Sequence, residues 1–163
     1  MSNSFSLRQT TILIPAFNEE RFLRQCLDSV VGQVDHVLIG DNASTDGTEA
    51  ICREYVAKHE HIQYIRHDVN IGSVGNLVHL AQLVETEFVL QIGAHDVLPE
   101  NYIVTLENLL HANRDAVCAY GNCSWLEWDG AISQTNDFIY VFAPRKQTFH
   151  RRFACNEIFY GKS

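Results

Sequence analysis

The sequence is poor in basic residues and in long apolar runs. Twelve Lys and Arg residues stand against twenty Asp and Glu residues, so the formal net charge at pH 7 is −8. This charge argues against nonspecific binding of nucleic acid, which needs a basic surface. The best apolar stretch, residues 88–94, is interrupted by Gln91 and is too short to cross a membrane.

The cysteines show no C-x-x-C spacing, and their odd number excludes a fully paired disulfide framework. They are Cys26, Cys52, Cys118, Cys123 and Cys155. We expect free thiols, most of them buried, in a reducing compartment. Residues 1–9 lack the basic and apolar segments of a signal peptide, so we expect a cytoplasmic protein. Five of the twelve basic residues lie in residues 144–163, which leaves open a peripheral contact with the inner face of a membrane.

Short runs of β-forming residues alternate with longer amphipathic runs along the chain. This alternation is typical of βαβ units, so we predict the α/β fold class with a mostly parallel sheet. No linker is visible, and we expect a single domain over residues 1–163. The predicted strands cover residues 10–15, 36–41, 62–66, 88–92 and 116–124.

Helices are predicted after each of the first four strands. Asn18 is expected to cap the first helix, and Asp46 with Glu49 to form a capping box at the second. The third helix begins near Gly72 and is expected to bury Leu77, Leu80, Ala81 and Val84. Farther along, the pattern predicts a helix opened by Pro99, a strand over residues 138–142 and a helix over residues 148–158.

Polar side chains gather where the first four predicted strands end. In open α/β sheets, ligands bind at this carboxyl edge. Turn and helix-cap chemistry explains each cluster taken singly, but four loops rich in amides and carboxylates exceed what capping requires. We therefore expect the loops to enclose a ligand. They cover residues 15–20, 41–48, 67–72 and 93–96.

Two common phosphate-binding motifs are absent. No G-x-G-x-x-G follows the first strand, which disfavours a dinucleotide cofactor, and no G-x-x-x-x-G-K-[ST] is present. The remaining possibility is a ligand whose base and ribose are held by carboxylates and amides and whose phosphates are neutralised by a divalent metal ion. Asp96, at the end of the fourth strand, is well placed to hold such an ion.

Four motifs follow one another in the order ILIPAFNEERFLRQCLDSV, VLIGDNASTDGT, VNIGSVGN and GAHDVLP. In this order they resemble glycosyltransferase family 2, and the resemblance covers roughly residues 10–125. It implies a GT-A (Rossmann-like) three-layer sandwich. It also implies inverting transfer of a sugar from a nucleoside-diphosphate sugar to a saccharide or lipid-linked acceptor, with Mn²⁺ or Mg²⁺ as cofactor. The implied setting is polysaccharide or lipid-linked oligosaccharide synthesis.

The resemblance also assigns roles to individual residues. The nucleoside pocket would be lined by Pro15, Ala16, Phe17 and Glu19. Asp41 would contact the nucleobase from the rim, with Asn42 and Ser44 shaping its loop, so that its removal should change folding little. The residues near the rest of the donor would be Asn70, Gly72, Asn76 and His95, and the metal ligand would be Asp96.

The chain departs from the family pattern at two positions of the site. Gly75 stands where the family usually has an arginine, and Gly93-Ala94-His95-Asp96 replaces the usual D-x-D-D. Two interpretations of His95 stay open: it helps to hold the ion, or it makes an ordinary hydrogen bond within its loop. No general base is assigned, because nothing in the context singles out the carboxylates Asp129 and Asp137. The chain is expected to lack the later portion that carries the acceptor site in relatives.

Two other functions compete with sugar transfer. A non-catalytic domain that only binds nucleotide is favoured by the altered metal segment and by the early end of the chain. A nucleotidyltransferase shares a related core and metal dependence, but it would show a glycine-rich, basic loop after the first strand. Residues 15–20 have neither property, so this alternative ranks last.

Overall fold

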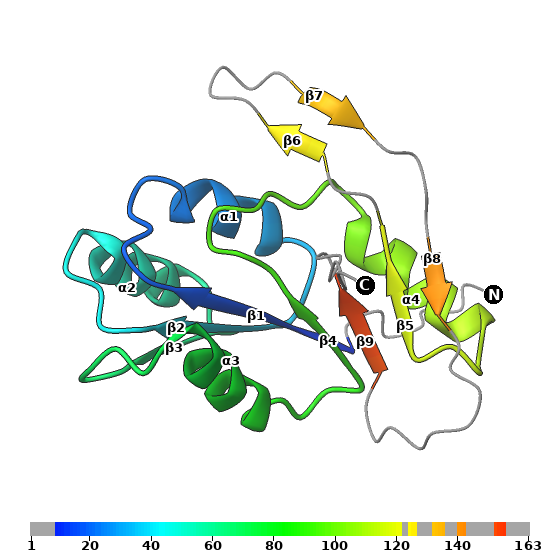
Figure 1. Ribbon diagram of the computed structural model, residues 1–163, viewed down its shortest axis with the longest axis horizontal. Helices are drawn as coiled ribbons and strands as arrows, with labels where there is room; N and C mark the ends of the chain where they lie inside the picture. Colours follow the sequence, from blue (N-terminus) through cyan, green and yellow to red (C-terminus); the bar gives the residue numbers. More distant parts are fainter. Residues whose placement is uncertain (1–8, 122–123, 127–131, 136–139, 143–151, 156–163) are drawn as a thin grey trace, which may run out of the picture.

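A seven-stranded sheet forms the centre of the computed structural model, which describes residues 9–121, 124–126, 132–135, 140–142 and 152–155 (Figure 1). The strand order is β3-β2-β1-β4-β9-β5-β8, and β6 with β7 forms a separate two-stranded sheet. The strands are β1 Thr10–Ala16, β2 His36–Asp41, β3 Ile62–Arg66, β4 Phe88–Gln91, β5 Cys118–Tyr120, β6 Ser124–Leu126, β7 Ile132–Thr135, β8 Tyr140–Phe142 and β9 Arg152–Cys155. The helices are α1 Leu23–Val30, α2 Thr48–Lys58, α3 Ser73–Gln82 and α4 Tyr102–Ala112.

The first four strands are parallel; β1, β2 and β3 end in step, and β4 ends three residues earlier along β1. Ala16 of β1 pairs with Asp41 of β2, which in turn pairs with Arg66 of β3. On the other side of β1, Leu13 pairs with Gln91, the last residue of β4. The loops that leave these strands therefore start from one edge of the sheet, as the alternation in the sequence predicts.

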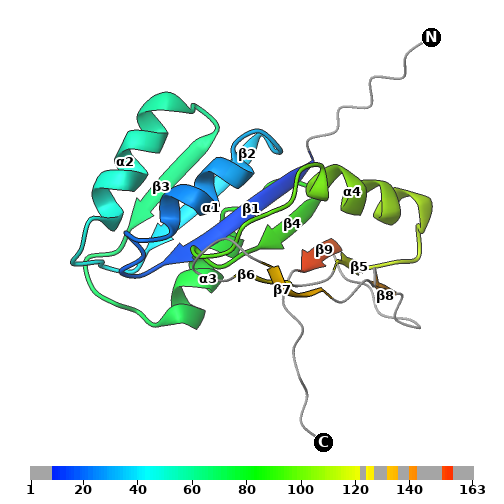
Figure 2. The same cartoon turned by 90° about the horizontal axis from the view of Figure 1, so that it is seen from above.

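Helices cover both faces of the sheet, but unequally. Figure 2 shows α1, α2 and α4 on one side and α3 on the other. Strand alternation separates two cores: Ile12 and Ile14 point toward α1, α2 and α4, whereas Leu13 points toward α3. The larger core includes four fully buried positions of α1 at three- and four-residue steps, which are Leu23, Cys26, Leu27 and Val30. The smaller core is built from Leu13, Leu38, Leu80, Val84 and Val89.

The two predicted helix caps differ from the observed ends. Asn18 does not cap α1, which begins five residues later at Leu23. Instead Asn18 has a left-handed φ of 56°, and its Oδ1 accepts a hydrogen bond from the backbone of Thr45. The contact between two loops has replaced the local cap. At α2, Asp46 accepts from the backbone N–H of Thr48, but Glu49 does not complete a capping box, because it pairs with Arg53 and Arg66.

The strands after α4 depart most from the sequence-based prediction. The strand predicted over residues 116–124 is two strands, β5 and β6, in different sheets. Residues 152–155 form β9 and not part of a helix, because pairing with β4 and β5 overrides the local helical pattern. The strand predicted over residues 138–142 is present as β8, with residues 138–139 outside the described part.

Three smaller differences concern helices. Ala81 is exposed, so of the four residues predicted to be buried only Leu77, Leu80 and Val84 pack in the small core, and Val84 lies beyond the end of α3. Pro99 precedes α4 in a turn in which its carbonyl accepts from Tyr102 N. Within the described residues no helix combines the length and hydrophobicity that a membrane crossing needs.

Candidate functional site

Four loops leave the carboxyl edge of the parallel strands: loop 1 (residues 17–22), loop 2 (42–47), loop 3 (67–72) and loop 4 (92–101). Loops 1 and 2 are joined by backbone-to-side-chain hydrogen bonds. Asn18 N donates to Ser44 Oγ at 3.0 Å, and Thr45 N donates to Asn18 Oδ1 at 2.8 Å. Just beyond loop 2, Thr48 Oγ1 accepts from Glu19 N at 2.8 Å. Hydrogen bonds with loop 2 and with the first residue of α2 thus fix the path of loop 1.

Loop 2 is joined to loop 3 in the same way. Asn42 Nδ2 donates to Asn70 Oδ1 at 2.9 Å, and Asn42 Oδ1 accepts from Ile71 N at 2.8 Å. The same Asn70 oxygen accepts from Gly72 N at 2.9 Å, where Gly72 has a left-handed φ of 80°. The amide of Asn42, which is 3% exposed, therefore serves to hold loop 3 in place.

Loop 4 closes the arrangement by contacting loop 1 and the helix after it. His95 Nδ1 lies 3.1 Å from Glu19 Oε1, and Cys26 Sγ of α1 donates to the carbonyl of Gly93. Burial raises the pKa of the Cys26 thiol to about 12, so it stays protonated at neutral pH. The structure therefore brings together all four loops that the sequence places at this edge.

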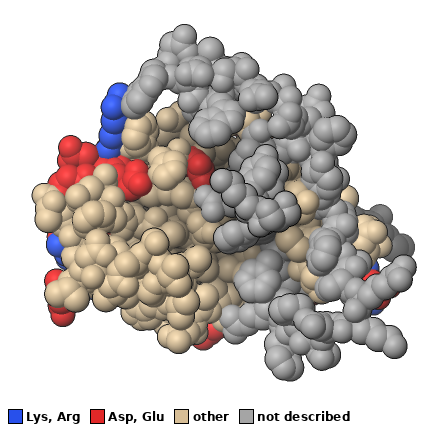
Figure 3. All heavy atoms as spheres, viewed as in Figure 1, with Lys and Arg blue, Asp and Glu red and all other residues tan. Residues whose placement is uncertain are grey.

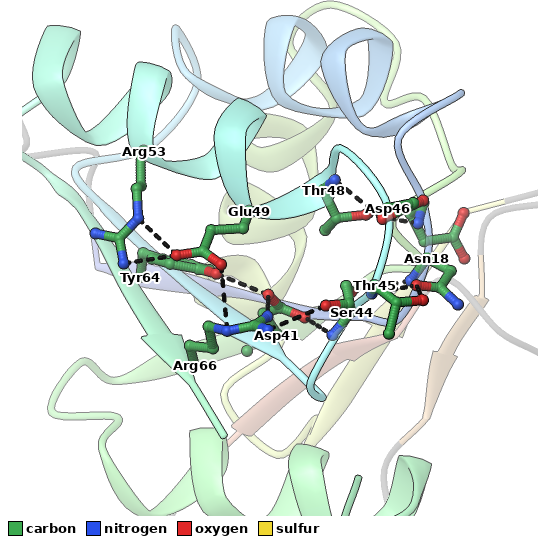
Figure 4. A network of polar contacts seen from close by, with 12 residues as sticks. Asn18, Asp41, Ser44, Thr45, Asp46, Thr48, Glu49, Arg53, Tyr64 and Arg66 are labelled. Atoms are coloured by element: carbon green, nitrogen blue, oxygen red, sulfur yellow. Dashed lines mark hydrogen bonds and ion pairs between the residues drawn. The ribbon is translucent and has the colours of Figure 1, made fainter. Parts of the chain in front are cut away.

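Asp41 lies at the centre of a polar network beneath loop 2 (Figure 4). Its Oδ1 accepts from Ser44 N at 2.8 Å, while Oδ2 accepts from Tyr64 Oη at 2.7 Å and Arg66 Nη1 at 2.6 Å. Its side chain is 0% exposed. The predicted rim position of Asp41 is therefore wrong, because Asp41 is an internal hub that joins β2, β3 and loop 2.

The charge on Asp41 is stabilised by its neighbours. Burial alone would raise the pKa of this carboxyl, but the hydrogen bonds from Ser44, Tyr64 and Arg66 outweigh burial and leave the pKa below its ordinary value. Burial and the bond to Asp41 raise the pKa of Tyr64. Tyr64 therefore remains a neutral donor and Asp41 an ionised acceptor over the physiological range.

Asn76 is also buried, at 1% exposure, and its amide bonds to protein groups. Nδ2 donates to the carbonyl of Gly40 at 2.7 Å, and Oδ1 lies 3.1 Å from His67 Nε2. The close approach to β2 requires glycine at position 40, since a Cβ there would overlap Asn76 Oδ1. Asn76 therefore fixes the start of α3 to the end of β2.

The remaining candidate residues differ in exposure. Phe17 is 45% exposed, so its ring is available for stacking on a flat ligand, whereas Ala16 before it is buried. Asn70, Gly72 and His95 are exposed, Ser44 is buried, and Pro15, Glu19 and Asp96 are partly buried. The set predicted from the sequence thus divides into a buried frame (Ala16, Asp41, Asn42, Ser44, Asn76) and an accessible lining (Pro15, Phe17, Glu19, Asn70, Gly72, His95, Asp96).

The donors available for a metal ion are few. Asp96 Oδ2 accepts from Gly93 N at 2.8 Å, and Oδ1 accepts no hydrogen bond within the described residues. Those residues contain no group of three or more His, Cys, Asp or Glu side chains that could hold a metal ion. Asp96 therefore suits an ion only if most of the other ligands come from a bound molecule such as a diphosphate.

Two residues of the network escaped sequence analysis, Tyr64 and Arg66. They occupy alternate positions of β3 and therefore point the same way, toward Asp41. Arg66 Nη2 also donates to the carbonyl of Ser44 at 3.0 Å, and its Nε lies 3.3 Å from Glu49 Oε2. Their i, i+2 spacing in the sequence indicates that they share one face of a strand. Their position beside Asp41 depends on the register between β2 and β3, which the sequence does not show.

Comparison with known proteins supplies the family and the fold. Abequosyltransferase RfbV of Salmonella typhimurium is 29% identical over 108 residues, which are 63% of this chain and 32% of that protein. S. aureus TarS 1-349 in complex with UDP matches with a TM-score of 0.61 and 23% identity, over 69% of this chain and 35% of that one. The mannosyltransferase PcManGT from Pyrobaculum calidifontis, in complex with GDP-Man and Mn²⁺, matches with a TM-score of 0.63 and 20% identity, over 72% and 36%.

These structural matches confirm the predicted α/β fold of GT-A type. The chain spans between 14% and 32% of the length of the first curated relatives that it matches. The family model described as glycosyl transferase family 2 matches residues 11–159, which is most of the chain. The protein therefore belongs to glycosyltransferase family 2.

Proposed function

We propose that loops 1–4 bind the nucleoside diphosphate of a sugar donor, and that the protein takes part in transfer of that sugar to a saccharide or lipid-linked acceptor. The observation that carries this proposal is the joining of four polar loops at one carboxyl edge, with an exposed aromatic ring beside them. Support comes from relatives of the same fold whose structures hold UDP, UDP-GlcNAc or GDP-Man.

The proposed donor contacts follow from exposure. Phe17 offers its ring to the base, with Pro15 and Glu19 beside it, because these side chains lie at the end of β1 and reach the surface. Asn70 and Gly72 of loop 3 would lie along the donor. Asp41 has no exposed surface, so its proposed role is to hold loop 2 and the Arg66 side chain, which is 34% exposed, beside the proposed site.

A divalent cation would be held by Asp96 together with the donor phosphates, with His95 and Glu19 as neighbours. Such an ion supplies charge that offsets the negative charge on the departing diphosphate. One protein carboxylate plus substrate phosphates is a usual arrangement for Mg²⁺, and Mn²⁺ accepts the same oxygen ligands. We also propose inversion at the anomeric carbon, as the family resemblance implies; Asp129 and Asp137 lie outside the described residues, and no general base is assigned.

A thermal-shift assay with UDP, GDP and their sugars, with and without Mn²⁺, tests the binding step. The ligand that binds the folded protein raises the melting temperature, and Mn²⁺ is expected to increase that rise. In Asp96→Ala the rise with nucleotide alone should remain, while the increase due to Mn²⁺ should be lost. Asp115→Ala is the matched control, because Asp115 is an exposed aspartate before β5, at the opposite edge. An undiminished Mn²⁺ effect in Asp96→Ala would place the ion elsewhere.

A nucleotide-binding domain without transfer activity is the second candidate, because Gly93 and Ala94 bring no carboxylate to loop 4. Hydrolysis of the nucleotide sugar in the presence of Mn²⁺ separates the two functions. Release of nucleoside diphosphate at a rate proportional to enzyme concentration supports the transferase. Binding without release over the same range supports the second candidate.

A further inference from the structure

Arg66 is the member of the ion pair with Asp41 that reaches the surface. The side chain of Asp41 is 0% exposed, whereas that of Arg66 is 34% exposed. A ligand bound at this edge can therefore contact Arg66 but not Asp41. Arg66 is the last residue of β3 and pairs in register with the last residue of β2, so it belongs to the same edge of the sheet as loops 1–4.

The guanidinium of Arg66 is held in one orientation by three acceptors. Nη1 donates to Asp41 Oδ2 at 2.6 Å, Nη2 donates to the carbonyl of Ser44 at 3.0 Å, and Nε lies 3.3 Å from Glu49 Oε2 (Figure 4). A guanidinium has one N–H at Nε and two at each Nη. These contacts use one N–H of each Nη and leave the other for a further acceptor, in a group whose plane is already fixed.

The order of the strands determines which part of a donor would lie beside Arg66. The order β3-β2-β1-β4 puts Arg66 of β3 and Asp96 after β4 on opposite sides of Phe17, which follows β1. Adjacent strands are about 4.8 Å apart, so β3 and β4 are separated by about 14 Å. In the proposed function the diphosphate lies with its ion at Asp96, and the base stacks on Phe17. The edge of the base that is farthest from the ribose then points toward β3.

The charges around Arg66 favour a neutral group over a phosphate. Its positive charge is balanced by Asp41 and Glu49, whose oxygens lie 2.6 Å and 3.3 Å away. Figure 3 shows acidic side chains gathered at the end of the molecule where loop 1 lies, and this loop contains Glu19 and Glu20. These carboxylates repel a phosphate that has no metal ion beside it, whereas a carbonyl oxygen carries no net charge. Arg66 therefore suits an oxygen of the base.

The common bases differ in what they present at the edge farthest from the ribose. Uracil and guanine carry a carbonyl oxygen there, which accepts hydrogen bonds, whereas cytosine and adenine carry an amino group, which donates them. Arginine has only donors and keeps its proton in proteins. An amino group at this position would face N–H groups with no acceptor between them. Such a mismatch leaves polar groups unpaired and lowers affinity.

We propose that Arg66 selects nucleoside diphosphates whose base carries a carbonyl oxygen at the edge farthest from the ribose, as in uracil and guanine, over those of cytosine and adenine. This inference rests on the proposed function, since it requires that loops 1–4 bind a nucleoside diphosphate. Asp41, Ser44 and Glu49 fix the guanidinium, and its remaining N–H groups donate to the base. A charged donor makes a stronger hydrogen bond than a neutral one, so the selection is expected to be large.

Isothermal titration calorimetry with matched nucleotide pairs, in the presence of Mg²⁺, tests the proposal. UDP and CDP differ only at this edge of the base, as do IDP and ADP. In whichever pair the site accepts, the carbonyl member should bind the wild-type chain at least about tenfold more tightly. Arg66→Lys keeps a positive charge beside Asp41 but loses the planar fork of donors, so the ratio of affinities should fall toward one.

Arg114→Lys is the matched control, because Arg114 is an exposed arginine before β5, at the opposite edge of the sheet, and its ratio should equal that of wild type. Equal affinities within each pair for the wild-type chain would overturn the inference while leaving nucleotide binding intact. An undiminished ratio in Arg66→Lys, or an equal loss for both members of a pair, would also overturn it. Absence of binding for all four nucleotides would overturn the proposed function and the inference with it. Circular dichroism confirms that each variant is folded, and the wild-type ratio tests the selection without any variant.

Discussion

At the scale of single residues, burial decides which polar groups frame the candidate site and which line it. Asp41 and Asn76 come from motifs that resemble donor contacts, yet both are almost fully buried and bond to protein groups. The sequence could place them at strand and helix ends, because turn-forming residues mark those ends. Their depth could not be read from it, since depth depends on Tyr64 and Arg66 of a neighbouring strand.

Removal of the Asp41 carboxylate is expected to destabilise the fold. Asp41→Ala leaves the Tyr64 hydroxyl and the Arg66 guanidinium without their partner, which should lower the free energy of unfolding by about 2–3 kcal/mol at neutral pH. Urea denaturation followed by circular dichroism measures this. The matched control is Asp68→Ala at an exposed aspartate, which should stay within about 0.5 kcal/mol of wild type.

The cost of Asp41→Ala should depend on pH in a defined direction. The pKa of Asp41 is lower in the folded than in the unfolded chain. The stability that the ionised carboxylate contributes to the fold is therefore fully present above the unfolded pKa and is lost as pH falls through the folded pKa. The difference between wild type and variant should therefore shrink as pH drops below about 4. A constant difference over this range would contradict the assigned ionic role.

At the scale of elements, the site depends on how closely α3 approaches β2. The four parallel strands follow the predicted residue ranges closely, because each is a short β-rich run bounded by turn residues. The start of α1 differs from the prediction, because the side chain of Asn18 bonds to the backbone of Thr45, in a segment distant in sequence, and does not cap the helix. The Gly40 contact with Asn76 is of the same kind, and it fixes the start of α3 against β2.

A methyl group at Gly40 is expected to disturb this contact. In Gly40→Ala the new Cβ overlaps Asn76 Oδ1, so α3 must shift or give up the hydrogen bond to the Gly40 carbonyl. The expected loss is about 2–3 kcal/mol of unfolding free energy, from overpacking and the lost bond. Gly32→Ala is the control, because its Cβ meets nothing within 4 Å. Thermal melts that show equal stability for the two variants would refute the role of Gly40.

At the scale of the whole molecule, the order of strands was beyond sequence reasoning. Alternating strands and helices predicted a parallel sheet, but the insertion of β9 between β4 and β5 brings residues 152–155 beside a strand more than sixty positions earlier. Single-sequence patterns carry local preference, and such pairing is decided by tertiary contacts. The carboxyl edge was nonetheless predictable, because parallel βαβ units place successive loops on one side.

The central claim is that a nucleoside diphosphate and a divalent ion bind at this edge, among loops 1, 2, 3 and 4. Backbone amide NMR spectra of the ¹⁵N-labelled chain, titrated with UDP and with GDP in the presence of Mg²⁺, test it most directly. Amides around Phe17, Asn42, Asn70 and Gly93 should shift together, and exchange of Mg²⁺ for paramagnetic Mn²⁺ should broaden signals nearest Asp96. Shifts confined to the opposite edge of the sheet, or no shifts at saturating nucleotide, would contradict the account.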